Sequence, residues 1–179
     1  MASEIVIAPD ERLRTECEPI EVIDDEVKKL AKRMAKAMYK YDGCGIAAPQ
    51  IGVCRQLVVI DCEWDGDPAS PKNPLFLINP VIVEQSEETK VGSEGCLSVP
   101  GVAFDIERST SVVVRALDLE GRLMQYEAAN NLFCVCLQHE IDHLHGVTML
   151  ERLTPTERLR GMREYQEALA AGARPGETE

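Results

Sequence analysis

With 179 residues, 45% of them apolar and 28% charged, the chain has the length and composition of one globular domain. Its formal net charge of −12 argues against a general affinity for DNA or anionic membranes, which bind through clustered Lys and Arg. The N-terminus lacks the basic and apolar regions of a signal peptide, and no apolar run approaches the roughly 18 residues of a membrane span. Seven cysteines without an export signal favour a reducing compartment, so we expect a cytoplasmic protein.

The first predicted element is a helix over residues 24–41, because apolar side chains recur there at three- and four-residue steps. Asp24 or Asp25 is the expected N-cap, and Gly43 is the expected stop. Apolar and alternating runs, separated by turn residues, then predict extended segments in the middle of the chain. They cover residues 56–61, 75–84 with Asn79-Pro80 as an interruption, 111–119 and 122–127, the last two as a hairpin.

Two helices are predicted in the last third of the chain, over residues 130–144 and 155–170. Residues 171–179 are expected to form a flexible tail, and no repeat or linker divides residues 1–170. We therefore predict the α+β class, as a single compact domain. Antiparallel or mixed sheets would surround a central helix that carries the motif HExxH, with further helices near both ends.

The motif HExxH stands in the segment QHEIDHLHG, residues 138–146. On a helix, His139 and His143 lie one turn apart on the same face, so both imidazoles can bind one metal ion. Glu140 lies one step round the helix, where its carboxylate can act as a base on a water molecule. His145 falls off this face and is expected to be a solvated histidine.

Two histidines leave a metal site incomplete, and the residues alone leave two candidates for a third ligand. A histidine six residues after His143 is excluded, because position 149 is methionine. The first candidate is a downstream carboxylate, as in other HExxH enzymes. Four such acids are available: Glu151, Glu157, Glu164 and Glu167. The second candidate is the thiolate of Cys96, in the segment GSEGCLSVPG, which cannot be a regular helix.

The segment GCGIAAPQIG, residues 43–52, has the glycine spacing of a dinucleotide-binding fingerprint. That fingerprint requires a strand before it and a helix after it. Here a predicted helix precedes the segment, and Pro49 and a predicted strand follow, so the fingerprint is rejected. We instead expect a loop whose small residues let a ligand approach the backbone, with the side-chain amide of Gln50 as a donor.

Three segments occur in one order along the chain: GCGIAAPQ at 43–50, EGCLS at 94–98 and QHEIDHLHG at 138–146. Together they resemble the peptide deformylases, and the similarity extends over nearly the whole chain. The resemblance implies a metal-dependent hydrolase that removes the N-formyl group from the N-terminal formylmethionine of new bacterial polypeptides and releases formate. Its partners would be N-formylmethionyl peptides, met as nascent chains at the ribosome.

The resemblance also implies the site residues and the cofactor. The three expected metal ligands are Cys96, His139 and His143. They would hold one divalent ion per chain, Fe2+ in the native bacterial enzymes, although the ligand set also accepts Zn2+, Ni2+ or Co2+. Glu140 would act as the base, while the Gln50 amide and the backbone N–H of Leu97 would bind the oxyanion. The positions expected around the substrate are Cys44, Gly45, Gly95, Leu132, Val135 and Cys136.

The chain departs from the family pattern at two places. Cys44 stands where family members often carry isoleucine or valine. Residues 102–105 lack the basic residue that members often place there. Arg108, paired with Asp142, could take the place of that basic residue and contact the peptide.

Two rival functions remain. A metallopeptidase would use the HExxH pair with a downstream acid in place of Cys96. A non-catalytic relative would bind formylated peptides or dock on the ribosome, yet no ligand or base is missing from this chain. The basic side chains of the last predicted helix are offset by acids, which argues against its docking on ribosomal RNA.

Overall fold

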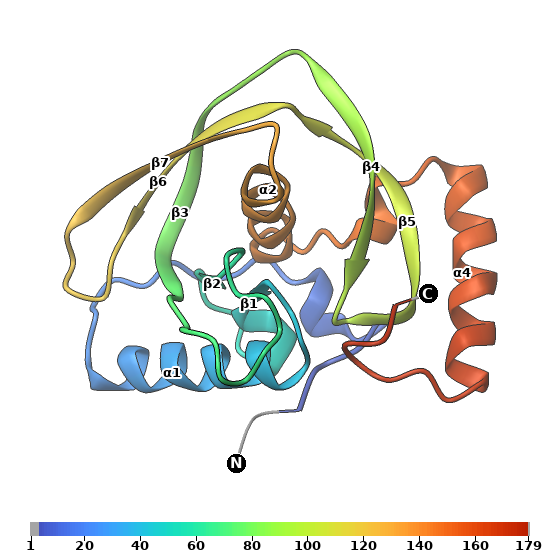
Figure 1. The fold of residues 1–179 in the computed structure, drawn as a ribbon, viewed down its shortest axis with the longest axis horizontal. Coiled ribbons are helices and arrows are strands. Elements are labelled where there is room, and N and C mark those ends of the chain that lie inside the picture. Colours follow the sequence, from blue (N-terminus) through green and yellow to red (C-terminus); the bar gives the residue numbers. More distant parts are fainter. Residues whose placement is uncertain (1–3, 179) are drawn as a thin grey trace.

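The computed structural model describes residues 4–178. The helical segments are η1 (Glu11–Arg14), α1 (Asp25–Lys40), η2 (Ala48–Ile51), α2 (Leu132–Leu144), α3 (Met149–Arg152) and α4 (Pro155–Ala170). The strands are β1 (Gly45–Ala47), β2 (Leu57–Ile60), β3 (Leu75–Gln85), β4 (Thr89–Cys96), β5 (Val99–Ser109), β6 (Ser111–Leu117) and β7 (Leu123–Ala129). Helix α2 lies at the centre, enclosed by strands, and α4 packs outside β5 (Figure 1). No helix in this described range is long and apolar enough to cross a membrane.

Every strand pair is antiparallel, and the predicted α+β class is confirmed. A five-stranded sheet has the order β1-β2-β3-β6-β7, and β4 and β5 form a separate two-stranded sheet. The predicted hairpin over residues 111–127 is confirmed as β6 and β7, with Leu117 paired to Leu123 at its end. Apolar side chains of β2, β6 and α2 share one core cluster, so the sheet holds the central helix in place.

Local hydrogen bonds set both ends of α1. The carboxylate of Asp24 accepts a hydrogen bond from the backbone N–H of Val27 at 2.9 Å, which confirms the predicted N-cap. The helix ends before the predicted stop at Gly43. Asp42 takes the left-handed conformation with φ of 55°, and the N–H of Gly43 donates to the carbonyl of Met38 at 3.0 Å. This is the usual helix-ending pattern, with aspartate in the position that glycine normally fills.

The Asn79-Pro80 interruption lies inside β3 instead of ending it. Asn79 has a left-handed backbone with φ of 49°, and the register against β6 shifts between Ile78 and Val81. The Asn79 side chain accepts from the N–H of Ile20 and donates to its carbonyl, both at 2.8 Å. The bulge therefore fastens the N-terminal segment to the sheet.

Several elements are absent from the sequence prediction. Strands β4 and β5 pair from Thr89 and Ser109 down to Cys96 and Val99, although the three glycines and one proline of residues 92–101 suggest irregular structure. The segment expected to be a loop after α1 contains β1 and η2. The short helix α3 follows a capping box that its own first turn provides. The strands among them depend on pairing between separate segments of the chain.

The flexible tail remains a prediction. In the structure the chain turns back after α4, through Gly172 with φ of 93°. The backbone N–H of Gly101, near the start of β5, donates to the carbonyl of Glu177 at 2.7 Å. Residues 174–178 therefore lie beside the β4–β5 hairpin, where Figure 1 places the C-terminal end of the chain.

Candidate metal centre

Helix α2 carries the HExxH motif, and the Asn131 side chain caps it by accepting a hydrogen bond from the N–H of Cys134 at 2.9 Å. Strands pack on several sides of this helix, so most of it is buried. His143 is fully buried, while His139 and Glu140 are only 8% and 4% exposed. Three ionisable side chains buried on one helix require compensating partners or an ion.

Cys96, at the end of β4, completes a ligand set with His139 and His143. The three ligand atoms lie within 4.8 Å of one another, and Cys96 Sγ is 3.3 Å from His143 Nε2. Around one ion, bonds of about 2.3 Å to sulfur and about 2.0 Å to nitrogen would separate these two atoms by about 3.5 Å. Burial lowers the pKa of His143 well below its usual value, which favours the neutral imidazole that binds metal. Cys96, His139 and His143 therefore form a metal site suited to one divalent ion.

Three of the four downstream acids have other partners. Glu151 and Glu157 accept hydrogen bonds from the threonines that cap α3 and α4. On α4, the Oε1 atom of Glu164 lies 3.3 Å from the Nε atom of Arg160. Within residues 4–178, no acid joins the two histidines in a group of metal-ligating atoms. The metallopeptidase alternative therefore lacks its third ligand.

A buried ion-pair network fixes the orientation of His139. The Nδ1 atom of His139 lies 2.8 Å from the carboxylate of Glu94, which leaves Nε2 for the metal. Arg108 donates to both oxygens of Glu94 at 2.8 and 3.0 Å, and to Asp142 at 2.5 Å. A carboxylate on the far nitrogen of a ligating imidazole fixes its tautomer and strengthens it as a ligand. The network therefore links β4, β5 and α2 through the metal site.

Two residues outside the ligand set can now be placed. The expected pairing of Arg108 with Asp142 is present, but Arg108 is 5% exposed and donates to Glu94 and Asp142. Arg108 therefore supports a metal ligand, and the suggestion that it contacts the peptide is not supported. The Nδ1 atom of His145 lies 2.6 Å from the carboxylate of Glu16, and half of the His145 side chain is exposed. That placement agrees with the prediction of a solvated histidine.

Glu140 lies beside the ligands with one unbonded carboxylate oxygen. Its Oε2 is buried and has no hydrogen-bond partner within residues 4–178. Burial raises the pKa of Glu140 to about 8, and a cation bound next to it would lower that pKa again. A Cβ atom on Gly45 would lie 2.6 Å from Glu140 Oε1 and 2.6 Å from Cys136 Sγ. Only glycine therefore lets β1 approach α2 at this point.

The side-chain amide of Gln50 points its nitrogen at the metal site. Its Oε1 accepts a hydrogen bond from the backbone N–H of Ala47 at 2.8 Å, which fixes the orientation of the amide. Its Nε2 then donates toward Cys96 Sγ at 3.6 Å and toward Ser98 Oγ at 3.2 Å. Gln50 is 1% exposed, so packing holds this donor in place. Leu97, next to Cys96, lines the same pocket.

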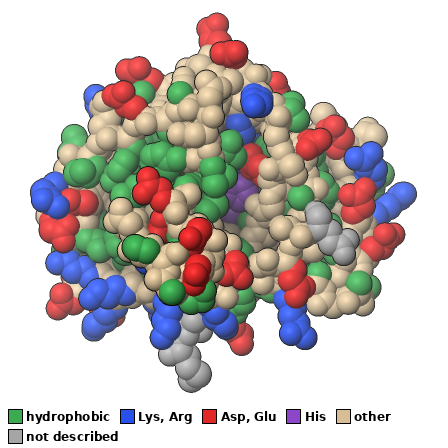
Figure 2. Space-filling model, viewed as in Figure 1, with side chains coloured by type: hydrophobic (Ala, Val, Ile, Leu, Met, Phe, Trp, Pro, Cys, Tyr) green, Lys and Arg blue, Asp and Glu red, His purple; other side chains and the backbone are tan. Residues whose placement is uncertain are grey.

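These groups surround a pocket of about 290 Å³. All the predicted site residues line it except His143, which is fully buried. Figure 2 shows a histidine at the bottom of a hollow in this face, with hydrophobic side chains beside it. The lining also includes residues that the sequence prediction lacks: Tyr41, Asp42, Gly43, Ser93, Glu94, Gly176 and Thr178. The first five lie in or next to the motifs at residues 43–50 and 94–98, so proximity in sequence could have indicated them, whereas no sequence signal indicates the last two.

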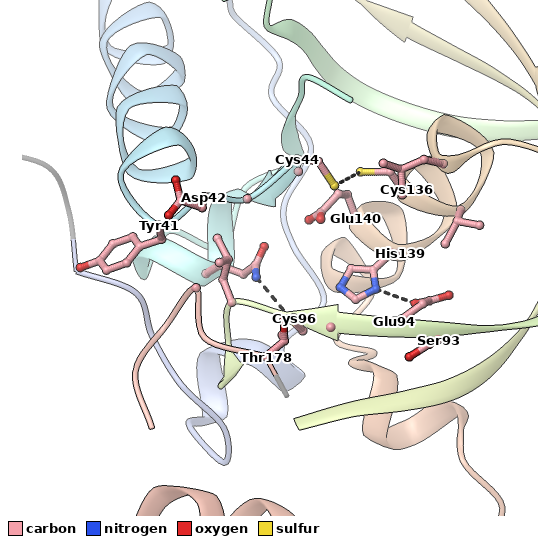
Figure 3. Close-up of a pocket in the computed structure, with 18 residues that line it drawn as sticks. Tyr41, Asp42, Cys44, Ser93, Glu94, Cys96, Cys136, His139, Glu140 and Thr178 are labelled. Carbon is pink, nitrogen blue, oxygen red and sulfur yellow. Dashed lines mark hydrogen bonds and ion pairs between the residues drawn. The ribbon is translucent and has the colours of Figure 1, made fainter. Parts of the chain in front are cut away.

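The last described residues lie against the mouth of this pocket. A Cβ on Gly95 would lie 2.5 Å from the Cγ2 atom of Thr178, and one on Gly176 would lie 2.5 Å from the carbonyl oxygen of Tyr41. Figure 3 shows Thr178 close to Cys96 on the pocket side of β4. Residues 176–178 therefore cover part of the opening between the end of α1 and the β4–β5 hairpin.

Acid should destabilise the protein through Glu94. Burial opposes ionisation of this carboxyl, but hydrogen bonds from Arg108 and His139 outweigh it and lower its pKa from 4.5 to about 2. A carboxyl with a lowered pKa in the folded state stabilises the fold above pH 4.5, and this stabilisation is lost as pH falls toward 2. Urea unfolding at about pH 5 and about pH 3 should show a large fall in the free energy of unfolding of the wild type. The Glu94→Gln variant should have a lower free energy of unfolding at about pH 5, and this free energy should fall less between the two pH values. Equal falls in the variant and the wild type would show that Glu94 is not responsible.

Comparisons with known proteins point to one family. The family model for polypeptide deformylase matches residues 2–159. A peptide deformylase of Afipia carboxidovorans is 42% identical over 172 residues, which cover 96% of this chain and 98% of that relative. One of Alkalilimnicola ehrlichii is 41% identical over 169 residues, covering 94% of this chain and 92% of the relative.

Solved structures agree with the sequence comparison. A peptide deformylase from Legionella pneumophila has a TM-score of 0.85 and 37% identity, over 96% of this chain and 99% of that one. A peptide deformylase from Synechococcus elongatus, crystallised in complex with actinonin, has a TM-score of 0.81 and 38% identity. That match covers 94% of this chain and 86% of the other.

Proposed function

The chain belongs to the polypeptide deformylase family, the metallohydrolases that remove the N-formyl group from newly made polypeptides. From this premise we propose that deformylation takes place at the Cys96, His139 and His143 site, with Glu140 as its general base. One observation carries the proposal. The three ligands converge beside a buried carboxylate oxygen of Glu140 that has no hydrogen-bond partner in the described range.

We propose Fe2+ as the ion that these ligands hold. One thiolate and two neutral imidazoles form a mixed set that binds several divalent metals of the first transition row. Which metal ion occupies the site therefore depends on metal supply and on how the protein is prepared. When bound, such an ion supplies Lewis acidity, which makes a water molecule more acidic and polarises the formyl carbonyl. Glu94 supports this role, because its carboxylate holds the imidazole of His139.

In the proposed mechanism Glu140 accepts one proton and later donates it. Its carboxylate first takes a proton from the water whose oxygen attacks the formyl carbon. The amide nitrogen of Gln50 and the backbone N–H of Leu97 donate hydrogen bonds to the oxygen that gains negative charge. Glu140 then gives the proton to the departing amine nitrogen as the C–N bond breaks, and formate and the free N-terminus are released.

The substrate side chain would enter the apolar part of the pocket. Its walls come from four of the expected substrate-binding positions: Cys44, Leu132, Val135 and Cys136. These side chains carry no charge-pairing group, so the slot suits methionine better than a charged residue. Gly45 and Gly95 line the pocket from two strands, where the absence of side chains leaves room for the substrate backbone.

We propose that the protein meets its substrates as the formylated N-termini of nascent chains in the cytoplasm, without docking α4 on ribosomal RNA. Arg158 of α4 donates to the carbonyls of Leu150 and Glu151 at 2.7 and 2.8 Å, and Arg160 lies beside Glu164. These cations are therefore partly engaged within the protein. The seven cysteines are unpaired, which suits a reducing compartment.

A Cys96→Ser substitution tests the proposed site. Wild-type protein prepared anaerobically with Fe2+ should release formate from formyl-Met-Ala-Ser. The variant should lose its iron on desalting and lose formate release with it, because a hydroxyl is a much weaker ligand than a thiolate. A Cys54→Ser control removes a half-buried thiol elsewhere and should behave as the wild type. An active, iron-retaining Cys96→Ser variant would contradict the ligand assignment, and an iron-loaded wild type that releases no formate would contradict the function.

A further inference from the structure

Cys44, Cys62 and Cys136 form a second cluster of metal-ligating side chains. Their sulfur atoms lie within 4.8 Å of one another, and the Sγ atoms of Cys44 and Cys136 are 4.0 Å apart (Figure 3). Cys44 precedes β1, Cys62 follows β2, and Cys136 belongs to α2. The N–H of Asp61 donates to the carbonyl of Cys44 at 2.8 Å, so the pairing of β1 with β2 brings the first two cysteines together.

The spacing of this thiol cluster suits one thiophilic ion. Two thiolates bound to zinc at about 2.3 Å and a near-tetrahedral angle lie about 3.8 Å apart, close to the separation of Cys44 and Cys136. Thiolate ligands select Zn2+ or Cu+ over hard cations such as Mg2+ and Ca2+.

We propose that Cys44, Cys62 and Cys136 bind a second metal ion, Zn2+, and that this ion blocks the part of the pocket that takes the substrate side chain. Binding exchanges the thiol protons for the ion and involves no oxidation or reduction. Cys44 and Cys136 line the substrate pocket, so an ion between them occupies space that the substrate needs. Glu140 Oε1 lies on the same side of Gly45 as Cys136 Sγ, and the ion's charge attracts this carboxylate.

The cluster also has an entrance of its own. Cys62 lines a separate surface cavity of about 460 Å³, and Leu132 lines both this cavity and the substrate pocket. The thiol cluster thus stands in the wall between the two hollows. An ion can reach Cys62 from the second cavity, and a Cys62 substitution leaves the lining of the substrate pocket unchanged.

The test counts two metals separately. Protein with Ni2+ in the Cys96 site is titrated with Zn2+ in the presence of a phosphine reductant, desalted, and analysed for both metals by mass spectrometry. Wild-type protein should keep its nickel, gain one zinc per chain, and lose formate release as zinc binds. The Cys62→Ser variant should keep its nickel and its activity and bind zinc at least about tenfold more weakly. The Cys54→Ser variant should match the wild type. Formate release before zinc is added tests the proposed function separately.

Three results would overturn the second site: zinc that replaces nickel one for one, equal zinc binding by wild type and Cys62→Ser, or no zinc uptake by the wild type. Zinc uptake that leaves formate release unchanged would overturn the blocking role. If Cys62→Ser fails to fold, the wild type is titrated with cadmium instead, and the absorption of thiolates bound to cadmium is measured. A second cadmium ion that adds no such absorption would also overturn the site.

Discussion

Replacing Glu140 with glutamine is expected to slow formate release by about 10²–10⁴-fold while the metal content stays unchanged. Glutamine has nearly the same shape, so the ligands His139 and His143 should keep their positions. Its neutral amide cannot take a proton from water or return one to the amine nitrogen. The loss should appear mainly in kcat, because the substrate pocket retains its lining.

The measurement is a steady-state formate assay with metal analysis of the same samples. Glu87→Gln provides a matched control, since Glu87 is exposed on the loop between β3 and β4 and the same charge is removed there. Glu87→Gln should keep wild-type activity. If Glu140→Gln retained wild-type turnover with full metal content, another residue would have to be the base.

Replacing Arg108 with leucine is expected to lower the free energy of unfolding by about 3–5 kcal/mol. The substitution leaves the carboxylates of Glu94 and Asp142 without the guanidinium that both contact, and the side chains of Arg108 and Glu94 are each 5% exposed. A buried charge without its partner is far more costly than a pair that was never formed. For a chain of this length, the loss corresponds to a fall in Tm of about 6–20 °C.

Arg122→Leu is the matched control for this experiment. Arg122 also pairs with an aspartate, Asp118 at 2.7 Å, but 72% of its side chain is exposed. Breaking that pair should cost less than about 1 kcal/mol. Arg108→Leu should in addition bind metal about 10–100-fold more weakly, because Glu94 would no longer be held against His139. Equal unfolding energies for the two variants would show that the buried network contributes no more than a surface pair.

The sequence was sufficient to predict the residues that lie in recognisable motifs. His139 and His143 follow from the geometry of one helix, and their convergence required no knowledge of the remaining fold. The third ligand was different, because residue chemistry alone left Cys96 and the downstream acids open. Only the resemblance to a family favoured Cys96, and the structure places it through a β4–β5 hairpin that glycine and proline residues had hidden.

Features created by tertiary contacts could not be predicted in the same way. Arg108 was linked correctly to Asp142, but its burial and its contact with Glu94 depend on how β4, β5 and α2 pack together. No sequence pattern indicates Cys62, because it stands at the start of a loop and comes near Cys44 only through strand pairing. Helix ends are easier to predict from sequence, since a capping side chain acts within one turn.

The position of residues 176–178 has a practical consequence for inhibitor discovery. Because Gly176 and Thr178 lie against the rim of the pocket, an affinity tag fused after them would start at the place where test compounds enter. Inhibition constants from such a fusion would combine compound affinity with competition from the tag. Screening should therefore use protein tagged at the other end, or cleaved to its own C-terminal sequence, and should compare both forms with one reference ligand.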